Sequence, residues 1–363
     1  MSATQGEQEW NDVADLPARL AHAMSEAVPT DPRLLWVQPA WLDEATDWIR
    51  ARLDEQELTL TGALEQPHVR WWSTVIRVPT SVGDLWFKAN ARPHAFEAAL
   101  VAILERLQPG RVPELVASDP ARGWLLMRDG GARLRELVQS SADLGHWHEV
   151  LPAYAELQLA VAPHVGELLA AGVPDERLSV LPSHLELLLE DEEALLLGRP
   201  DGLSDEERER ARALLPELGR ACEQLPSYGI PETLQHDDFH DGNVFVREGG
   251  YLFFDWGDSC VSHPFHTLVV TLRAIAHRLE LPPGGPDLLL LREAYLEPFA
   301  SYGSLDELRE AAELAHFTGT AARTLAWARS LAAREAEFRA DDAETVPYGL
   351  RRLIDLGPIG SWN

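Results

Sequence analysis

Short apolar segments in the first third of the chain have the pattern of β-strands. The segments 58–62, 71–78 and 84–89 are rich in β-branched and aromatic residues and are too short for typical helices. Gln66-Pro67 separates the first segment from the second, and Ser81-Val82-Gly83 separates the second from the third. We therefore expect an antiparallel meander of three strands.

Two helices and two further strands are expected around this meander. Residues 43–56 and 94–107 repeat apolar positions with helical spacing. Residues 112–117 and 123–127 are again short and apolar, as strands are. The second of these runs into Arg128-Asp129-Gly130-Gly131, whose glycine pair is the best linker signal in the chain.

Beyond this linker, helical spacing dominates. One hairpin interrupts it, with strands at 244–247 and 251–254 joined by Glu248-Gly249-Gly250. The expected helices are 134–138, 150–165, 184–197, 205–218, 267–279, 286–302 and 304–340.

The pattern predicts an α+β fold with two lobes. A small, mostly antiparallel sheet with one helix leads through a hinge into a larger helical lobe that contains the hairpin. The expected divisions are a polar N-terminal extension at 1–35, a small lobe at 36–128 and a helical lobe at 129–363. A length of 363 residues exceeds one typical domain and fits this division.

The composition indicates a folded chain without a membrane segment. Hydrophobic residues make up 45% of the sequence, and no stretch approaches the roughly 20 apolar residues that a membrane helix needs. Residues 1–11 have no basic start followed by an apolar run, so we expect no secretory signal and a cytoplasmic location. Cys222 and Cys260 form neither a disulfide framework nor a metal-ligand pattern, and we interpret both as buried thiols.

The formal net charge of −28 argues against two classes of partner. A chain this acidic is repelled by the phosphate backbone of nucleic acids and by anionic lipid heads. We therefore expect neither nucleic acid nor a membrane as a partner. The expected partner is a small molecule, bound by a monomer or a homodimer.

Lys88, at the end of the third expected strand, is the only lysine among 31 lysine and arginine residues. Arginine fills every other basic position, so a lysine that persists here points to a need for its compact ammonium. The broad planar fork of arginine does not supply that shape. Lys88 is therefore a candidate functional residue.

The two ends of the expected hairpin carry the densest group of polar side chains in the sequence. Asp238 precedes Asn243 by five positions before the hairpin, and Asp255-Trp256-Gly257 follows it. This is the spacing of the catalytic and metal-binding elements of protein kinases. In that chemistry one carboxylate orients the attacking hydroxyl, whereas an amide oxygen and a second carboxylate hold Mg²⁺ against the phosphate oxygens.

These residues make the chain similar to the aminoglycoside phosphotransferase and choline kinase family, whose loop reads roughly H-G-D-x-H-x-x-N. The resemblance covers about residues 55–340 and implies a bilobal protein-kinase-like fold. It implies that Asp238 is the catalytic residue, that His236 structures its loop, and that Asn243 and Asp255 bind Mg²⁺. It also implies that the nucleotide, ATP or GTP, is bound by Lys88, Glu97, Met127, Arg128 and Gly130.

The sequence departs from the pattern of the family in two places. Asp237 stands where the family has glycine, and no G-x-G-x-x-G occurs in the first strands. In its place, Ser73 is the candidate to offer a hydroxyl and a backbone N–H to phosphate oxygens. His240 is expected to brace the loop. The candidates for acceptor contacts or for support of the site are Asp237, His240, Asp241 and Asp258.

The implied reaction is transfer of the γ-phosphoryl group of ATP or GTP to a hydroxyl of a small molecule. Asp237, Asp241 and Asp258 crowd the expected mouth of the site. Because negative charge attracts cations, this crowding favours a cationic acceptor such as an aminoglycoside, an amino sugar or an amino alcohol.

Two other functions stay open at this point. One is a pseudokinase module that holds a nucleotide without turnover. The other is a metal-dependent phosphohydrolase, because the alternating residues His236, Asp238 and His240 share one face of an extended segment and are possible metal ligands.

Overall fold

The computed structural model describes residues 32–332 and 342–361. Its largest sheet has five antiparallel strands in the order β1-β2-β3-β5-β4. The strands are β1 (Glu65–Val69), β2 (Ser73–Thr80), β3 (Gly83–Asn90), β4 (Leu115–Asp119) and β5 (Trp124–Arg128). The described chain after this sheet is mainly helical, which confirms the predicted α+β fold with a small antiparallel sheet and a larger helical part.

The first strand lies elsewhere than the sequence pattern predicts. The segment 58–62 makes only an isolated bridge, between Leu60 and Thr80, whereas β1 contains the Gln66-Pro67 pair expected to separate two strands. Proline has no N–H to donate to a neighbouring strand and is therefore tolerated at the edge of a sheet. Because β1 is an edge strand, Pro67 fits there, and the prediction for this segment is wrong.

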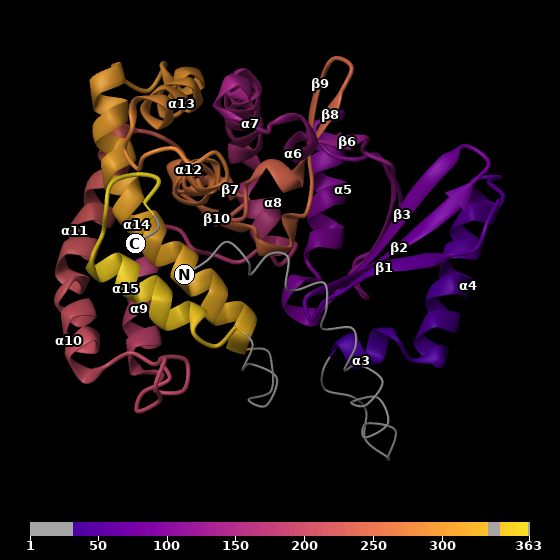
Figure 1. Ribbon diagram of the computed structural model, residues 1–363, viewed down its shortest axis with the longest axis horizontal. Helices are drawn as coiled ribbons and strands as arrows, with labels where there is room; N and C mark the ends of the chain where they lie inside the picture. Colours follow the sequence, from indigo (N-terminus) through magenta and orange to yellow (C-terminus); the bar gives the residue numbers. More distant parts are fainter. Residues whose placement is uncertain (1–31, 333–341, 362–363) are drawn as a thin grey trace.

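Helix α4 (Pro39–Glu55) covers one face of the sheet (Figure 1). Its buried residues recur every four positions and form one stripe: Trp41, Ala45, Ile49 and Leu53. The stripe packs against alternate residues of the strands, among them Leu85 and Phe87 of β3. Lys88 follows Phe87 directly and therefore belongs to the opposite face of the sheet.

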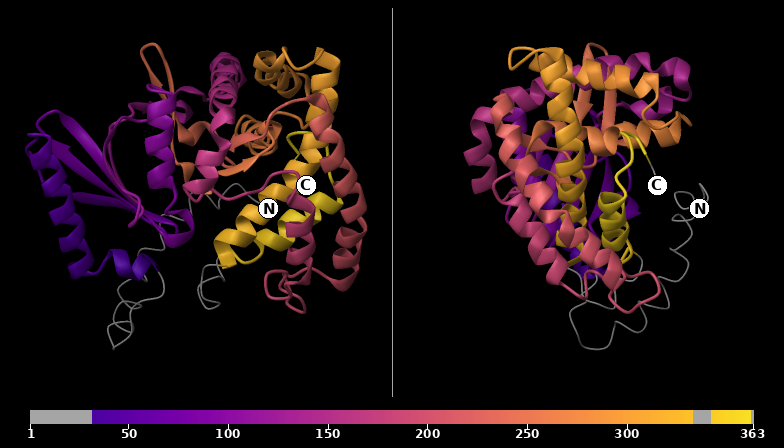
Figure 2. Two further views of the ribbon diagram at one scale, coloured as in Figure 1. Left: turned by 180° about the vertical axis from the view of Figure 1, so that it is seen from behind. Right: turned by 90° about the vertical axis from the view of Figure 1, so that its left-hand side faces the viewer.

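Helix α5 (Glu97–Leu107) lies between the sheet and the helical part, on the other side from α4 (Figure 1). Its buried apolar residues belong to the large core of the helical part, whereas α4 packs in a separate, smaller core. Helix α5 therefore links the sheet to the helical part, and the view from behind shows the same arrangement (Figure 2).

The remaining helices confirm most of the predicted segments. They are α3 (Pro32–Trp36), α6 (Leu134–Leu137), α7 (Gly145–Val161), α8 (Val165–Ala170), α9 (Leu181–Glu190), α10 (Asp205–Ala213), α11 (Leu215–Gln224), α12 (Thr267–Arg278), α13 (Pro286–Leu296), α14 (Leu305–Ala332) and α15 (Thr345–Ile354). The segment 205–218 is two helices instead of one, because Pro216 begins a new helix within its first two positions. Residues 1–31 of the expected extension and 333–340 of the last expected helix lie outside the described residues.

Short strands hold the segments before and after the hairpin together. The predicted hairpin is formed by β8 (Val244–Arg247) and β9 (Gly250–Phe253), and β6 (Ala132–Arg133) pairs with β8. Strand β7 (Thr233–Gln235) precedes the hairpin and pairs with β10 (Cys260–Ser262), which follows it. This pairing brings the polar segments 236–243 and 255–258 to the same region of the molecule.

The structure also bears on the apolar segments and on the two cysteines. Among the described residues, no helix is long and apolar enough to cross a membrane. Cys222 and Cys260 are free and buried, as expected. Burial raises the pKa of the Cys222 thiol to about 12, so it stays protonated and serves packing.

Candidate active site

Lys88 lies between two carboxylates. Its Nζ is 2.6 Å from Glu97 Oε2 and 2.5 Å from Asp255 Oδ1. The side chains of Lys88 and Glu97 are buried, whereas that of Asp255 is 42% exposed. Burial opposes the charge of Lys88, but Asp255 and Glu97 outweigh it and raise the pKa of Lys88 above its ordinary value. A permanently charged ammonium therefore stands beside a carboxylate that a ligand can reach.

Glu97 connects Lys88 to the segment after the hairpin. It is the first residue of α5, and its Oε1 accepts a hydrogen bond of 2.9 Å from the backbone N–H of Trp256. Trp256 is fully buried and donates its indole N–H to Phe253 O at 3.0 Å, so it serves core packing. The structure thus brings together Lys88 and Glu97, which the sequence paired.

Asp255 stands at a sharp turn of the chain. It follows β9 with a left-handed backbone conformation, φ +65°, which asparagine and aspartate adopt more readily than other residues with a side chain. The turn lets the next three residues form the short helix η7 (Trp256–Asp258). Burial favours the neutral acid, but Lys88 outweighs it and keeps the pKa of Asp255 below its ordinary value.

Asp238 is braced by residues of its own loop. Asn243 Nδ2 donates to the Asp238 carbonyl oxygen at 3.0 Å and to Asp238 Oδ2 at 3.3 Å. His240 Nδ1 accepts the backbone N–H of Gly242 at 2.9 Å, so the proton of the neutral ring is on Nε2, which lies 3.3 Å from Asp238 Oδ2. Burial favours the neutral acid, but His240 and then Arg323 outweigh it and hold the pKa of Asp238 well below its ordinary value.

His236 lies in the core beneath this loop. Its ring donates through Nε2 to Phe254 O at 2.9 Å, and its backbone N–H donates to the hydroxyl oxygen of Tyr154 at 3.0 Å. Burial lowers the pKa of His236, so the imidazole stays neutral. His236 therefore ties the segment before the hairpin to the residue directly after it.

Asp237 occupies the glycine position of the family with a backbone that glycine favours, φ +63°. Its buried carboxylate lies 3.2 Å from Arg323 Nη1, and burial raises the pKa of Asp237 to about 6 against the effect of Arg323. Arg323 also lies 3.4 Å from Asp238 Oδ1 and 3.9 Å from Asp258 Oδ2. One arginine of α14 thus faces three carboxylates.

Asp241 is matched by two other arginines. Its carboxylate lies 2.7 Å from Arg278 Nε and 3.3 Å from Arg135 Nη2. Together with the pairing of Asp237, this finding shows that two of the three carboxylates expected at the mouth of the site have arginine partners. The arginines come from α6, α12 and α14, which are distant in sequence, so local spacing did not reveal them.

Two other nucleotide-site candidates lie on the Lys88 face of the sheet. Lys88 pairs with Val75 across β2 and with Leu125 across β5. Ser73 and Met127 are each two residues from one of these partners and therefore belong to the same face. The register thus brings Ser73, Lys88 and Met127 to one side of the sheet.

Other parts of the protein form hydrogen bonds with the backbone of the hinge. Arg247 of the hairpin donates to Asp129 O at 2.9 Å and to Gly130 O at 3.3 Å. The backbone N–H of Arg128 donates to Glu114 O at 2.9 Å. Two carbonyl oxygens and one N–H of the segment expected to bind the base are therefore already hydrogen-bonded within the protein.

The structure gives no support to the phosphohydrolase alternative. Within residues 32–332 and 342–361, no group of three or more His, Cys, Asp or Glu side chains is placed to hold a metal. His236 and His240 thus join no such group in the described chain. Asn243 and Asp255 instead offer an amide oxygen and a carboxylate, the hard oxygen ligands that Mg²⁺ prefers.

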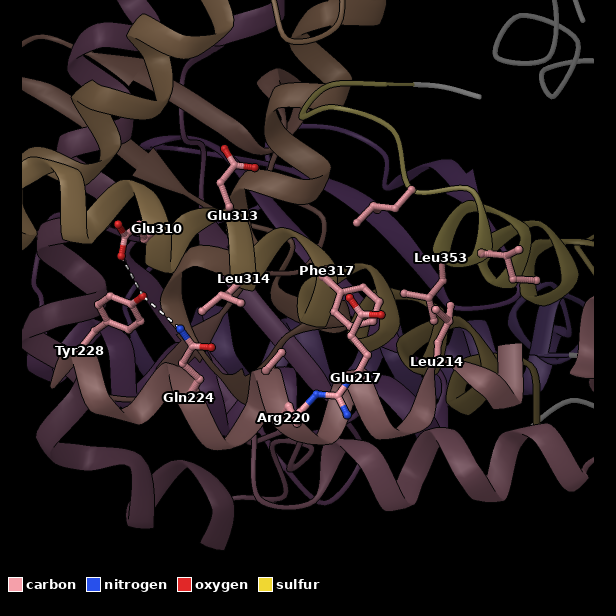
Figure 3. Close-up of a pocket in the computed structure, with 13 residues that line it drawn as sticks. Leu214, Glu217, Arg220, Gln224, Tyr228, Glu310, Glu313, Leu314, Phe317 and Leu353 are labelled. Atoms are coloured by element: carbon pink, nitrogen blue, oxygen red, sulfur yellow. Dashed lines mark hydrogen bonds between the residues drawn. The ribbon is translucent and has the colours of Figure 1, made fainter. Parts of the chain in front are cut away.

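A groove of about 830 Å³ lies away from these residues, between α11 and α14 (Figure 3). Apolar residues and glutamates line it, among them Leu214, Leu314, Phe317, Glu217, Glu310 and Glu313. None of the candidate site residues lines this groove. The candidate active site is therefore placed by its chemistry and not by this groove.

Comparison with known families assigns the fold and its activity. A model of the phosphotransferase enzyme family matches residues 64–308, from the start of the sheet to beyond the hairpin. This chain belongs to the phosphotransferase enzyme family. It is therefore a small-molecule phosphotransferase, and the matched region contains both Lys88 and the Asp238 loop. No curated protein matches this phosphotransferase significantly.

Solved structures of small-molecule kinases share the fold of this phosphotransferase. The choline kinase LicA from Streptococcus pneumoniae has a TM-score of 0.53 at 12% identity, over 85% of this chain and 99% of that one. The Plasmodium vivax ethanolamine kinase has a TM-score of 0.52 at 11% identity, over 94% of this chain and 92% of that one. A macrolide 2'-phosphotransferase type I has a TM-score of 0.51 at 16% identity, over 85% of this chain and 97% of that one. These likenesses confirm the predicted bilobal, protein-kinase-like fold.

Arg323, which faces Asp237, Asp238 and Asp258 in this phosphotransferase, was not predicted from the sequence. No local motif surrounds it. A weak signal was nevertheless present, because Arg323 is the only charged residue from 314 to 328 in an otherwise apolar and small-residue helix. A lone charge in such a helix needs a partner, since an unpaired buried charge is costly.

Proposed function

We propose that this phosphotransferase moves the γ-phosphoryl group of ATP or GTP to a hydroxyl of a small molecule. The observation that carries the proposal is the contact of Lys88 with both Glu97 and Asp255, the latter 167 residues away in sequence. A charged ammonium beside an accessible carboxylate suits phosphate oxygens that are also held by a divalent cation. A module that only binds nucleotide does not explain the braced Asp238.

Asp238 is the residue that we assign to the acceptor hydroxyl. Its carboxylate is ionised, since its pKa is held below the ordinary value, and about 30% of its side chain is exposed. A carboxylate with so low a pKa is a weak base. It therefore acts mainly by accepting a hydrogen bond from the hydroxyl and aligning its oxygen with the phosphoryl group, and the proton moves late.

Asn243 and Asp255 would hold the divalent cation, which we take to be Mg²⁺. The amide nitrogen of Asn243 donates to Asp238, so its amide oxygen is the atom that remains for a cation. Asp255 is ionised and half-exposed, which suits a ligand. When bound, the cation neutralises charge on the phosphate oxygens.

The nucleotide would lie against the Lys88 face of the sheet. Lys88 would contact the α and β phosphates, with Glu97 fixing its ammonium. Ser73 is the candidate for a further phosphate contact and Met127 for packing on the base. We assign the edge of the base to the backbone between Arg128 and Gly130 that the contacts of Arg247 leave available.

We specify the acceptor only as a small molecule with a hydroxyl group. The solved relatives are named for choline, ethanolamine and macrolides, and a shared fold does not choose among such acceptors. The pairing of Asp237 with Arg323, and of Asp241 with two arginines, removes the electrostatic reason for expecting a cationic one.

The substitution Asp255→Asn tests the nucleotide half of the proposal. It removes the charged ligand while keeping the size of the side chain, so Mg²⁺ should no longer tighten the binding of ATP. The measurement is a calorimetric titration of ATP with and without Mg²⁺. Asp355→Asn, at an exposed ion pair, is the control and should behave like the wild type. Equal Mg-ATP affinity for wild type and Asp255→Asn would contradict the assignment.

A further inference from the structure

Arg323 brings a positive charge to the carboxylates of the candidate site. It comes from the last turns of the long helix α14, and its side chain is only 11% exposed. Its two terminal nitrogens lie between 3.2 and 3.9 Å from the carboxylates of Asp237, Asp238 and Asp258. Asp238 is the one of these that our proposal assigns to the acceptor, so the guanidinium stands at the acceptor side.

The same guanidinium lies over an aromatic ring. Trp327 follows Arg323 by one helical turn, and the Arg323 Cζ is 5.2 Å from its ring centroid. An ammonium group is bound in proteins by carboxylates, by the faces of aromatic rings, or by both. Arg323 uses both kinds of contact and therefore occupies the position that a cationic ligand would need.

A second arginine strengthens this positive surrounding. The charge of Arg323 lowers the pKa of Arg273 on α12, and the charge of Asp238 raises it. Its pKa is lowered to about 10, first by burial and then by Arg352 and Arg323. A cation that entered beside Asp238 would be repelled by both arginines, and it would find its binding position already occupied by Arg323.

We propose that Arg323 fills the cation position of the acceptor site and so selects acceptors that carry no positive charge. This inference rests on the proposed function, because it takes Asp238 as the residue that meets the acceptor. A cationic acceptor must displace the guanidinium from its carboxylates, which leaves a buried charge unpaired. An uncharged hydroxyl compound has no such cost, and Arg323 acts as a positioning and specificity residue.

The test compares choline with its uncharged isostere 3,3-dimethyl-1-butanol, since the two differ mainly in charge. Both are titrated calorimetrically into the wild type, Arg323→Leu and Arg323→Lys. The wild type should bind choline no more tightly than the isostere. Arg323→Leu exposes three carboxylates and a tryptophan face, so it should bind choline at least about tenfold more tightly than the wild type does. Arg323→Lys keeps the charge and should resemble the wild type.

Two results would overturn the inference. One is a wild type that prefers choline over the isostere, and this comparison needs no variant. The other is an Arg323→Leu protein that binds Mg-ATP like the wild type, which shows that it is folded, yet gains no affinity for choline. If that variant does not fold, Arg323→Gln takes its place. Failure of the proposed function would instead show as a wild type that does not bind Mg-ATP, whereas the comparison of choline with its isostere in the wild type uses no nucleotide.

Discussion

The ammonium of Lys88 is a single group on which three separate elements converge. It leaves β3 and meets one carboxylate from the start of α5 and one from the turn after β9. Both contacts are near the lower limit of ion-pair distances, and the side chain is buried. A larger cation therefore has no room in this position without moving the two acids.

We expect Lys88→Arg to reduce turnover by at least about 100-fold although it keeps the charge. The planar guanidinium does not fit where the compact ammonium lies, so Glu97 and Asp255 lose their positions. The measurement is ADP release from Mg-ATP, together with circular dichroism to show that folding survives. Arg210→Lys, at an exposed ion pair, is the matched control and should have the turnover of the wild type. Full activity of Lys88→Arg would show that the solitary lysine is a chance survivor.

Single residues of the site differ in how far the sequence revealed them. Asp238, Asn243 and Asp255 stand in one short stretch with a recognisable spacing, so their grouping around the hairpin was predictable. Arg323 and Arg278 reach the same loops from distant helices, and no local pattern records such a contact. The assigned roles of these residues remain predictions until they are tested.

At the scale of elements, the hinge and the hairpin depend on close packing at one glycine. A Cβ added to Gly130 would lie 2.0 Å from Phe245 Cδ2 on β8. Arg247 of the same strand donates to the hinge carbonyls, so the hairpin also fixes the hinge by hydrogen bonds. The shape of the hinge is therefore coupled to the hairpin between the Asp238 loop and Asp255.

We expect Gly130→Ala to destabilise the protein by about 1 to 3 kcal/mol, the usual cost of overpacking. The free energy of unfolding is measured by urea denaturation. Gly145→Ala, where the added Cβ meets nothing within 4 Å, is the control and should be neutral. Adding Phe245→Leu to Gly130→Ala should recover part of the loss. A Gly130→Ala protein that is as stable as the wild type would show that the hinge and the hairpin are not tightly coupled.

The short helix η8 (Pro264–His266) provides a test of pH dependence. His263 caps it by accepting the N–H of Phe265 at Nδ1, and burial lowers the pKa of His263 from 6.5 to about 3. Between pH 6.5 and about 3, His263 is therefore protonated in the unfolded chain but not in the folded chain. The contribution of His263 to the free energy of unfolding is fully present above pH 6.5 and is lost as the pH falls from 6.5 towards 3.

His263→Asn keeps an oxygen to accept the capping hydrogen bond but does not titrate. We expect its free energy of unfolding to fall less between pH 7 and pH 5 than that of the wild type, in urea denaturation at each pH. Any constant cost of the substitution cancels in this comparison. Parallel pH profiles for the two proteins would contradict the assignment.

Elements were predictable where their pattern was long. The amphipathic helices and the strands of the meander next to Lys88 followed from spacing, whereas the three-residue strands β7 and β10 are too short to show any period. The two prolines have opposite positions from those expected: Pro67 lies inside an edge strand instead of between two strands, and Pro216 lies at the start of a helix within a segment predicted as a single helix.

In the whole molecule, the nucleotide candidates Ser73, Lys88 and Met127 lie on the sheet, whereas the acceptor candidates lie in the segments before and after the hairpin. Helix α5 packs with the helical core and yet holds Lys88 through Glu97. The boundary between residues 128 and 129 remains a prediction. The two-lobed fold was predictable from sequence because strand patterns and helix patterns are separated along the chain by one glycine pair.

The central claim is phosphoryl transfer with Asp238 at the acceptor hydroxyl. Its most direct test measures acceptor-dependent ADP release from Mg-ATP by wild type and Asp238→Asn, over a panel of amino alcohols, amino sugars, neutral sugars and macrolides. We predict that at least one acceptor stimulates the wild type and that Asp238→Asn lowers kcat by at least about 100-fold while Mg-ATP affinity is nearly unchanged. Turnover of Asp238→Asn at the wild-type rate, or a wild type that does not bind Mg-ATP, would contradict the account.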